Sequence, residues 1–335
     1  MAFPLSYILF FFTLSLSISI SISSPSWFSI WVGLELNMIS FIPLITIKMN
    51  SFFSESALKY FLIQALGSTL LIFSSCMLLS FPKLSPPLLL SSLFLKLGSA
   101  PFHFWFPQVM MGLTWPKSII LMTLQKIPPM ILISYLSTFT TLTQIIILSA
   151  ILSAVIGALG GFNTMQLRKM MAFSSINHMS WMLMSMMLSD MFWIMYFTFY
   201  SLISSSIVIL FNVFQTSTLS DLMKSPQINS TTHSLIISLN LLSLGGLPPF
   251  TGFIPKWMLT QLLINNNLFI PLILLFSSAL ITLYFYLRIT IFFLFTTKPS
   301  STANTKLNIP LYFLPSSLLF FNFLMLFLPF IFLFL

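Results

Sequence analysis

Charged residues are scarce in this sequence, and acidic residues are the scarcest. Of its 335 residues only 5% are charged, with 13 lysines and arginines against 4 aspartates and glutamates. A soluble domain carries about 25% charged residues, so this chain cannot cover itself with an aqueous surface. Its 58% of hydrophobic residues and its mean hydropathy of +1.04 indicate a polytopic membrane protein. In such a protein, the net charge of +9 reports loops held on one side of the bilayer rather than nucleic-acid binding.

Cysteine is nearly absent, since Cys76 is the single one. One cysteine excludes an internal disulfide and a cysteine-ligated iron–sulfur or zinc site. The 3 histidines lack the facing pair that a b-type haem requires. No stretch is polar and long enough to form a soluble module for NADH, ATP or nucleic acid. We therefore expect no resident cofactor, no metal site and no nucleic-acid partner.

Long apolar runs recur from one end of the chain to the other. Each can cross a ~30 Å hydrocarbon core as a helix. We expect an all-α membrane protein with about eleven transmembrane helices, forming a single transmembrane domain over residues 1–335. The predicted spans are 3–23, 26–46, 57–80, 86–106, 117–136, 141–161, 170–188, 191–214, 233–264, 268–293 and 310–333.

The basic residues are distributed unevenly over the predicted loops. If the spans alternate in direction, one side of the membrane receives only Lys83. The positive-inside rule places the N-terminus on the basic side and, with an odd number of spans, the C-terminus on the opposite side. The basic side receives Lys48, Lys59, Lys117, Arg168, Lys169, Lys224, Arg288, Lys298 and Lys306.

Four charged residues fall near the middle of predicted spans, namely Glu35, Lys96, Lys126 and Lys256. Each costs about 2.5–3.5 kcal/mol on an insertion scale, and three lysines cannot all pair with one glutamate. A lysine removed from water can accept and release a proton near neutral pH. We interpret the four as a polar axis near the midplane that carries protons. An anion carrier that uses the lysines, or a structural role in bracing helices, stays an alternative.

Helix-breaking residues accompany the three lysines. Lys96 lies in SLFLKLGSAPFHFW, Lys126 in TLQKIPP and Lys256 in GGLPPFTGFIPKW. Carbonyls freed by such breaks are tolerated in a membrane only where they face protein or a hydrated cavity, so we expect hydrated pockets beside the lysines. Two corresponding discontinuous helices, near Lys96 and Lys256, are also typical of an inverted-repeat, antiporter-like bundle.

Two histidines are possible proton relays. His103 follows Lys96 closely and is placed to pass protons between it and Lys126, whereas His178 lies inside the predicted span 170–188. Each is equally compatible with a hydrogen-bonded histidine in a helix interface.

Five runs of residues carry a family resemblance. They are WVGLELN (31–37), SLFLKLGSAPFHFW (92–105), TLQKIPP (123–129), QLRKMMAFSSINHMSWM (166–182) and GGLPPFTGFIPKW (245–257). In this order over nearly the whole chain, they resemble the chain 2 family of mitochondrial NADH:ubiquinone oxidoreductase, respiratory complex I. The length resembles the short animal-type form, in which the first three helices of the fourteen-helix relatives are missing.

The resemblance implies a core membrane-arm subunit that couples NADH-to-ubiquinone electron transfer to proton translocation. Glu35 would pair with Lys96, and Lys126 would link to Lys256 on the route to a neighbouring antiporter-like subunit. NADH, FMN, iron–sulfur clusters and ubiquinone would be bound by other subunits, and cardiolipin is an expected lipid partner.

The resemblance also implies the compartment. The chain would lie in the mitochondrial inner membrane, with its N-terminus on the matrix side and its C-terminus on the intermembrane-space side. A cation/proton antiporter, free-standing or multi-subunit, is the alternative function, although such antiporter subunits resemble the longer fourteen-helix form.

Overall fold

The computed structural model describes residues 5–46, 51–224 and 231–296, and this part of the chain is built from α-helices joined by short turns. An isolated antiparallel bridge joins Gln166 to Thr218. The predicted all-α class is therefore confirmed. The contacts divide the chain into two compact units, Met1–Ser153 and Ala154–Leu335.

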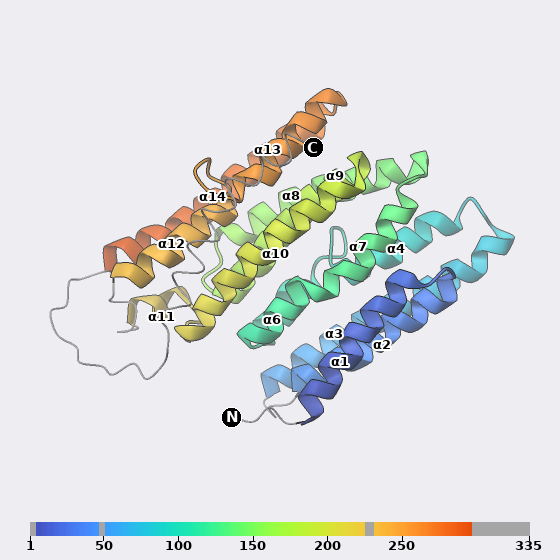
Figure 1. Ribbon diagram of the computed structural model, residues 1–335, viewed down its shortest axis with the longest axis horizontal. Helices are drawn as coiled ribbons and strands as arrows, with labels where there is room; N and C mark the ends of the chain where they lie inside the picture. The colour runs from blue at the N-terminus through green and yellow to red at the C-terminus, as the bar shows by residue number, and fades with distance from the viewer. Residues whose placement is uncertain (1–4, 47–50, 225–230, 297–335) are drawn as a thin grey trace. The chain divides into compact units, whose positions relative to one another are not determined.

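The first unit is a group of helices in which α1, α2 and α3 pack side by side, as the blue helices of Figure 1 show. The close approach of α1 and α2 depends on Gly33, because a Cβ there would lie 2.8 Å from the Ser21 backbone nitrogen. The elements of this unit are α1 (Leu5–Ser23), α2 (Trp27–Thr46), α3 (Ser51–Ser80), α4 (Ser85–Leu97), α5 (Trp105–Gly112), α6 (Trp115–Met122), the 3-10 turn η1 (Leu124–Lys126), α7 (Ile127–Leu136) and the first part of α8 (Thr140–Phe162).

The second unit contains the rest of α8 and the helices that follow it. Pairs of them pack along their length, α9 against α10 and α12 against α14. The elements are α9 (Leu167–Leu188), α10 (Asp190–Val213), α11 (Leu219–Lys224), α12 (Thr231–Gly245), α13 (Phe253–Asn265) and α14 (Phe269–Thr296).

Within the described residues, 7 helical stretches are long and apolar enough to cross a membrane. The expected number of about eleven is not confirmed. Two of the predicted spans, 86–106 and 233–264, are each broken into two shorter helices, and α9 is a full-length helix but more polar than the others. The predicted span 310–333 lies outside the described residues, as do Lys48, Lys298 and Lys306.

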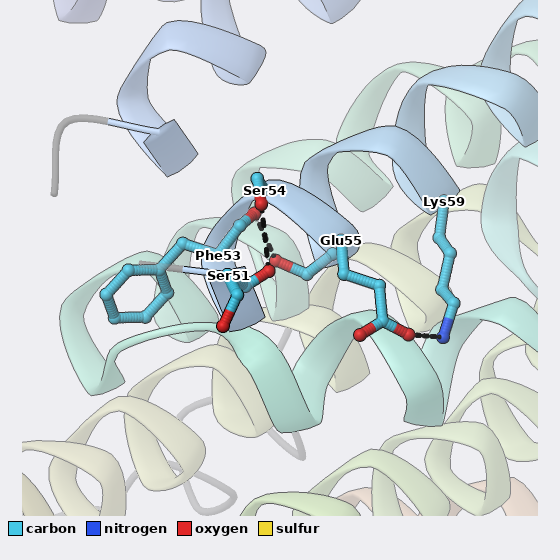
Figure 2. Close-up of polar contacts among 6 residues, drawn as sticks. Ser51, Phe53, Ser54, Glu55 and Lys59 are labelled. Atoms are coloured by element: carbon cyan, nitrogen blue, oxygen red, sulfur yellow. Dashed lines mark hydrogen bonds and ion pairs between the residues drawn. The ribbon is translucent and has the colours of Figure 1, made fainter. Parts of the chain in front are cut away.

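Many serine hydroxyls on the long helices are satisfied locally. Serine hydroxyls donate to the carbonyl three residues earlier, as Ser17 does to Leu14 at 2.7 Å, which removes the cost of an unpaired hydroxyl in hydrocarbon. Figure 2 shows the first turns of α3, where Glu55 and Lys59 form an exposed ion pair of 2.6 Å. This i,i+4 pair supports a polar start, so α3 begins at Ser51 rather than at the predicted residue 57.

Candidate functional site

Lys96 lies in the last turn of α4, where the chain is forced out of helical conformation. Gly98 adopts φ 71°, a left-handed conformation that glycine tolerates at no steric cost, and its N–H donates to the carbonyls of Phe94 and Leu95. The Lys96 side chain is buried, with 6% of its surface exposed. A cation in the last turn interacts favourably with the negative end of the helix dipole, so α4 itself stabilises the charged form of Lys96.

One face of α3 receives this lysine. Gln64 donates from Nε2 to the Lys96 carbonyl at 3.3 Å, so it pairs a backbone oxygen at the end of α4. One turn further, a Cβ on Gly67 would lie 3.0 Å from Lys96 Cγ. The absence of a side chain at Gly67 therefore gives the aliphatic stem of Lys96 its place against α3.

Lys126 lies at the second break, between α6 and α7. Pro128 and Pro129 are in the first turn of α7, where the missing N–H breaks no helical hydrogen bond. The chain before them turns through η1, which ends at Lys126. The Lys126 side chain is 2% exposed, and its Nζ lies 5.2 Å from the centroid of the Phe106 ring, a cation–π contact.

A chain of polar side chains crosses the same region. The Tyr60 hydroxyl donates to Gln125 Oε1 at 3.1 Å, and Gln125 Nε2 donates to Asn37 Oδ1 at 2.9 Å. These bonds join α3, η1 and α2. The Gln125 amide is thus held at both ends, directly before Lys126 in the sequence.

Lys96 and Lys126 line one small cavity of the first unit. The space open to the centre of a water molecule is ≈ 20 Å³, which is enough for about one water. Because amide, phenol and ammonium groups surround it, a water there would find the polar partners it needs. The lining residues are Leu34, Asn37, Tyr60, Gln64, Lys96, Leu97, Trp105, Phe106, Leu121, Gln125, Lys126 and Pro129.

Glu35 lies on α2, close enough for its charge to act on Lys96. Its Oε2 is buried without a hydrogen-bond partner. In the described part of the chain, Glu35 and Lys96 do not form an ion pair within 4 Å. The pairing that the resemblance implies stays a prediction, and an unpaired buried carboxylate oxygen leaves room for a partner to approach.

The second unit builds a similar arrangement around Lys256, at the break between α12 and α13. Lys256 Nζ donates to the Gly245 carbonyl at 2.8 Å, at the C-terminal end of α12, and lies 5.9 Å from the Trp181 ring centroid. Gly246 has φ 81°, and a Cβ there would lie 2.9 Å from Lys256 Cδ. Glycine is therefore required at 246 both for the turn and for the space that Lys256 occupies.

The two histidines have different surroundings. His178 Nδ1 lies 3.0 Å from the Tyr196 hydroxyl, and both residues line a cavity of the second unit that Gly252 and Pro255 also border. His103 lies between α4 and α5, with Nδ1 3.2 Å from the Pro101 carbonyl. His103 is not among the residues that line the cavity shared by the two lysines of the first unit.

Sequence reasoning did not single out four polar residues of the first cavity, Asn37, Tyr60, Gln64 and Gln125. A usable signal was present, because an amide inside an apolar span is costly unless it is paired. Among the described residues, no group of three or more His, Cys, Asp or Glu side chains could hold a metal ion.

Comparisons with known proteins bear on this arrangement. Residues 24–85 and 83–282 match the family profile described as NADH:quinone oxidoreductase/Mrp antiporter, TM. NADH-ubiquinone oxidoreductase chain 2 of Anopheles gambiae is 49% identical over 80% of this chain and 80% of its own length. The same chain of Loxodonta africana is 38% identical over 91% of this chain and 90% of its own length.

Solved structures show the same fold. Respiratory complex I from Thermus thermophilus has a chain that superimposes with a TM-score of 0.76 at 22% identity, covering 90% of this chain and 73% of that one. A chain of an archaeal membrane-bound sulfane sulfur reductase superimposes with a TM-score of 0.83 at 16% sequence identity, covering 97% of this chain and 73% of that one. A chain of the Mrp complex from Dietzia superimposes with a TM-score of 0.73 at 15% sequence identity, covering 83% of this chain and 58% of that one.

Proposed function

The chain belongs to the NADH-ubiquinone oxidoreductase chain 2 family, and we propose that within this enzyme it moves protons along Glu35, Lys96, Lys126 and Lys256. As a family member it is a subunit of NADH:ubiquinone reductase, and it is a mitochondrial membrane protein. The observation that carries the proton proposal is that Lys96 and Lys126 are both buried and line one cavity.

The chemistry of the proposed path follows from the side chains. When the Glu35 carboxylate moves away from Lys96, the Lys96 ammonium loses a favourable charge and releases its proton more readily. Lys126 is the acceptor on the same cavity. When Glu35 returns, its charge again favours the ammonium form, and Lys96 takes up a new proton from water that enters the path. Lys256 belongs to the second unit. We include it in the path because it is buried and lies at a helix break, as Lys96 and Lys126 do.

Lys126→Met in the assembled complex tests the path. A positioned proton carrier contributes roughly 10²–10⁴-fold to a rate, so we expect proton translocation through this subunit to fall by at least the lower of these factors while the complex still assembles. Lys59→Met is the matched control, because Lys59 is exposed and paired only with its neighbour on α3. Unchanged protons per NADH in Lys126→Met would refute the path.

The finer features of the subunit belong to the same proposal. We infer a single transmembrane domain of about eleven spans, with two discontinuous helices in an inverted-repeat bundle. The N-terminus would face the matrix and the C-terminus the intermembrane space of the inner membrane. Neighbouring membrane-arm subunits would be its partners, one of them antiporter-like, and cardiolipin would contact it. NADH, FMN, iron–sulfur clusters and ubiquinone would bind elsewhere in the enzyme.

The antiporter alternative is less well supported. The curated relatives are chains of NADH-ubiquinone oxidoreductase at 36–49% identity, whereas the Mrp structure shares 15% of its residues and is covered over 58% of its length. Mild detergent extraction followed by native electrophoresis distinguishes the two functions. Co-migration with an active NADH dehydrogenase of very large mass is expected, and a small inactive particle would favour the antiporter.

A further inference from the structure

Three side chains of the first unit form a hydrogen-bonded chain, which we call the relay. The proposed proton path does not use these side chains, so their presence needs another explanation. Asn37 of α2, Gln125 of η1 and Tyr60 of α3 are joined by bonds of 2.9 and 3.1 Å, and all three line the cavity that Lys96 and Lys126 share. Neither amide changes its protonation near neutral pH, nor does a phenol. Their contribution is therefore geometric.

The relay connects both helix breaks to α3. The Tyr60 ring packs edge-on against Trp105 at 6.0 Å, and the Trp105 indole N–H donates to the Leu95 carbonyl at 3.0 Å, next to Lys96. The Tyr60 hydroxyl reaches Gln125 on the other side, next to Lys126. Tyr60 thus contacts Trp105, which bonds next to Lys96, and Gln125, which precedes Lys126.

The relay also fixes the direction of the Gln125 amide. Its carbonyl end accepts from Tyr60, and its NH₂ end donates to Asn37. One N–H and one lone pair of this amide stay available in a cavity with room for about one water. An apolar trio would meet no desolvation cost at this place, so packing alone gives no reason for three polar groups here.

We propose that Gln125 is a positioning residue for proton transfer: held by Tyr60 and Asn37, it orients the η1 turn so that Lys126 faces Lys96 across one water that the amide binds. The inference rests on the proposed function. In the transfer step an N–H bond of the Lys96 ammonium breaks as an O–H bond of the water forms, and another O–H bond of that water breaks as an N–H bond forms on neutral Lys126. Lys96 ends neutral, Lys126 ends charged, and the water is regenerated.

The experiment measures assembled complex, electron transfer and protons translocated per NADH for Gln125→Met and Tyr60→Phe. A displacement of about 1 Å costs of order 10²-fold in a positioned reaction. We therefore expect translocation through this subunit to fall about tenfold or more, with assembly retained. Gln144→Met and Tyr135→Phe are the matched controls, because both residues are exposed on helices of the same unit.

The reciprocal variant Asn37→Gln with Gln125→Asn separates positioning from folding. It keeps an amide–amide bond but draws the residue-125 amide one methylene away from the Tyr60 hydroxyl, so the complex should assemble while translocation stays reduced. If Gln125→Met does not assemble, Tyr60→Phe and the reciprocal variant decide. Normal protons per NADH in both Tyr60→Phe and the reciprocal variant would overturn the inference. Lys126→Met separates this inference from the proposed proton path. If Lys126→Met loses translocation while the Tyr60 and Gln125 variants keep it, the path stands and only the positioning role of Gln125 fails.

Discussion

At the residue scale, the space left by glycine decides where a buried lysine can lie. Gly67 on α3 and Gly246 after α12 each face the aliphatic stem of a lysine, at 3.0 Å from Lys96 Cγ and 2.9 Å from Lys256 Cδ when a Cβ is added. Lysine and glycine are far apart in the sequence in the first case and near in the second. Steric fit thus places both lysine stems, and the Lys256 ammonium also donates to the Gly245 carbonyl.

Gly67→Ala is predicted to impair proton translocation more than stability. Overpacking costs about 1–3 kcal/mol, and alanine regains about 1 kcal/mol through its higher helix propensity, so the complex should still assemble. The added methyl group moves Lys96 away from α3, and translocation through this subunit should fall. Measured protons per NADH should drop relative to Leu66→Ala, a control at an exposed position of the same helix. Equal ratios in both variants would contradict the steric argument.

Asp221 gives a pH-dependent prediction outside the membrane-spanning helices. Hydrogen bonds, first that of the Ser217 hydroxyl at 2.7 Å and then that of the Thr218 N–H, lower the pKa of the Asp221 carboxyl from 3.8 to about 2. Because the folded pKa is depressed, the stabilisation is complete above 3.8 and is lost as the pH falls towards 2. The turn before α11 should therefore loosen in acid.

Hydrogen exchange checks this turn. The N–H groups of Ser217 and Thr218 donate to the Asp221 carboxylate, so Asp221→Asn should raise their exchange rates at neutral pH. The ratio of variant to wild-type rates should approach one as the pH falls to about 2, where the wild-type carboxyl also becomes protonated. A ratio that does not depend on pH would show that the carboxylate does not hold the turn.

At the scale of elements, local residues predict the breaks but not the contacts across them. Gly98 ends α4, and Pro128 and Pro129 lie in the first turn of α7, which begins directly after Lys126. Both breaks could therefore be predicted from short motifs. The bonds from Gln125 to Tyr60 and Asn37 join residues 65 and 88 positions apart. They depend on how α2 and α3 pack against the break, which no single motif encodes.

Trp105→Phe tests what holds the first break together. The aromatic contact with Tyr60 would remain, but the Leu95 carbonyl would lose its 3.0 Å donor. A neutral hydrogen bond contributes about 0.5–1.5 kcal/mol, so thermal unfolding of the complex should begin at a lower temperature and amides of α4 should exchange faster. Trp257→Phe, at a half-exposed position of α13, should change neither. Unaltered exchange in α4 would show that the break is held by other contacts.

At the scale of the whole chain, each unit contains a hydrogen bond between two helix ends or loops. If the spans alternate in direction, both members of each pair lie on the same side of the membrane. In the first unit, Lys117 Nζ donates to the Ile45 carbonyl at 2.9 Å, which ties the end of α2 to the start of α6. In the second, Gln166 pairs with Thr218, which ties the segment before α9 to the one before α11. Both joins are consistent with the predicted loops on the basic side of the membrane.

Single-cysteine labelling tests which side that is. With Cys76 replaced by serine, Lys83→Cys and Asn163→Cys each place one exposed thiol in a loop between helices. The positive-inside rule assigns the loop at 83 to the intermembrane space and the loop at 163 to the matrix. In mitochondria stripped of their outer membrane, an impermeant maleimide should label residue 83 directly and residue 163 only after the inner membrane is permeabilised. The opposite order would invert the orientation, and labelling of both from one side would mean that the number of spans between them is not odd.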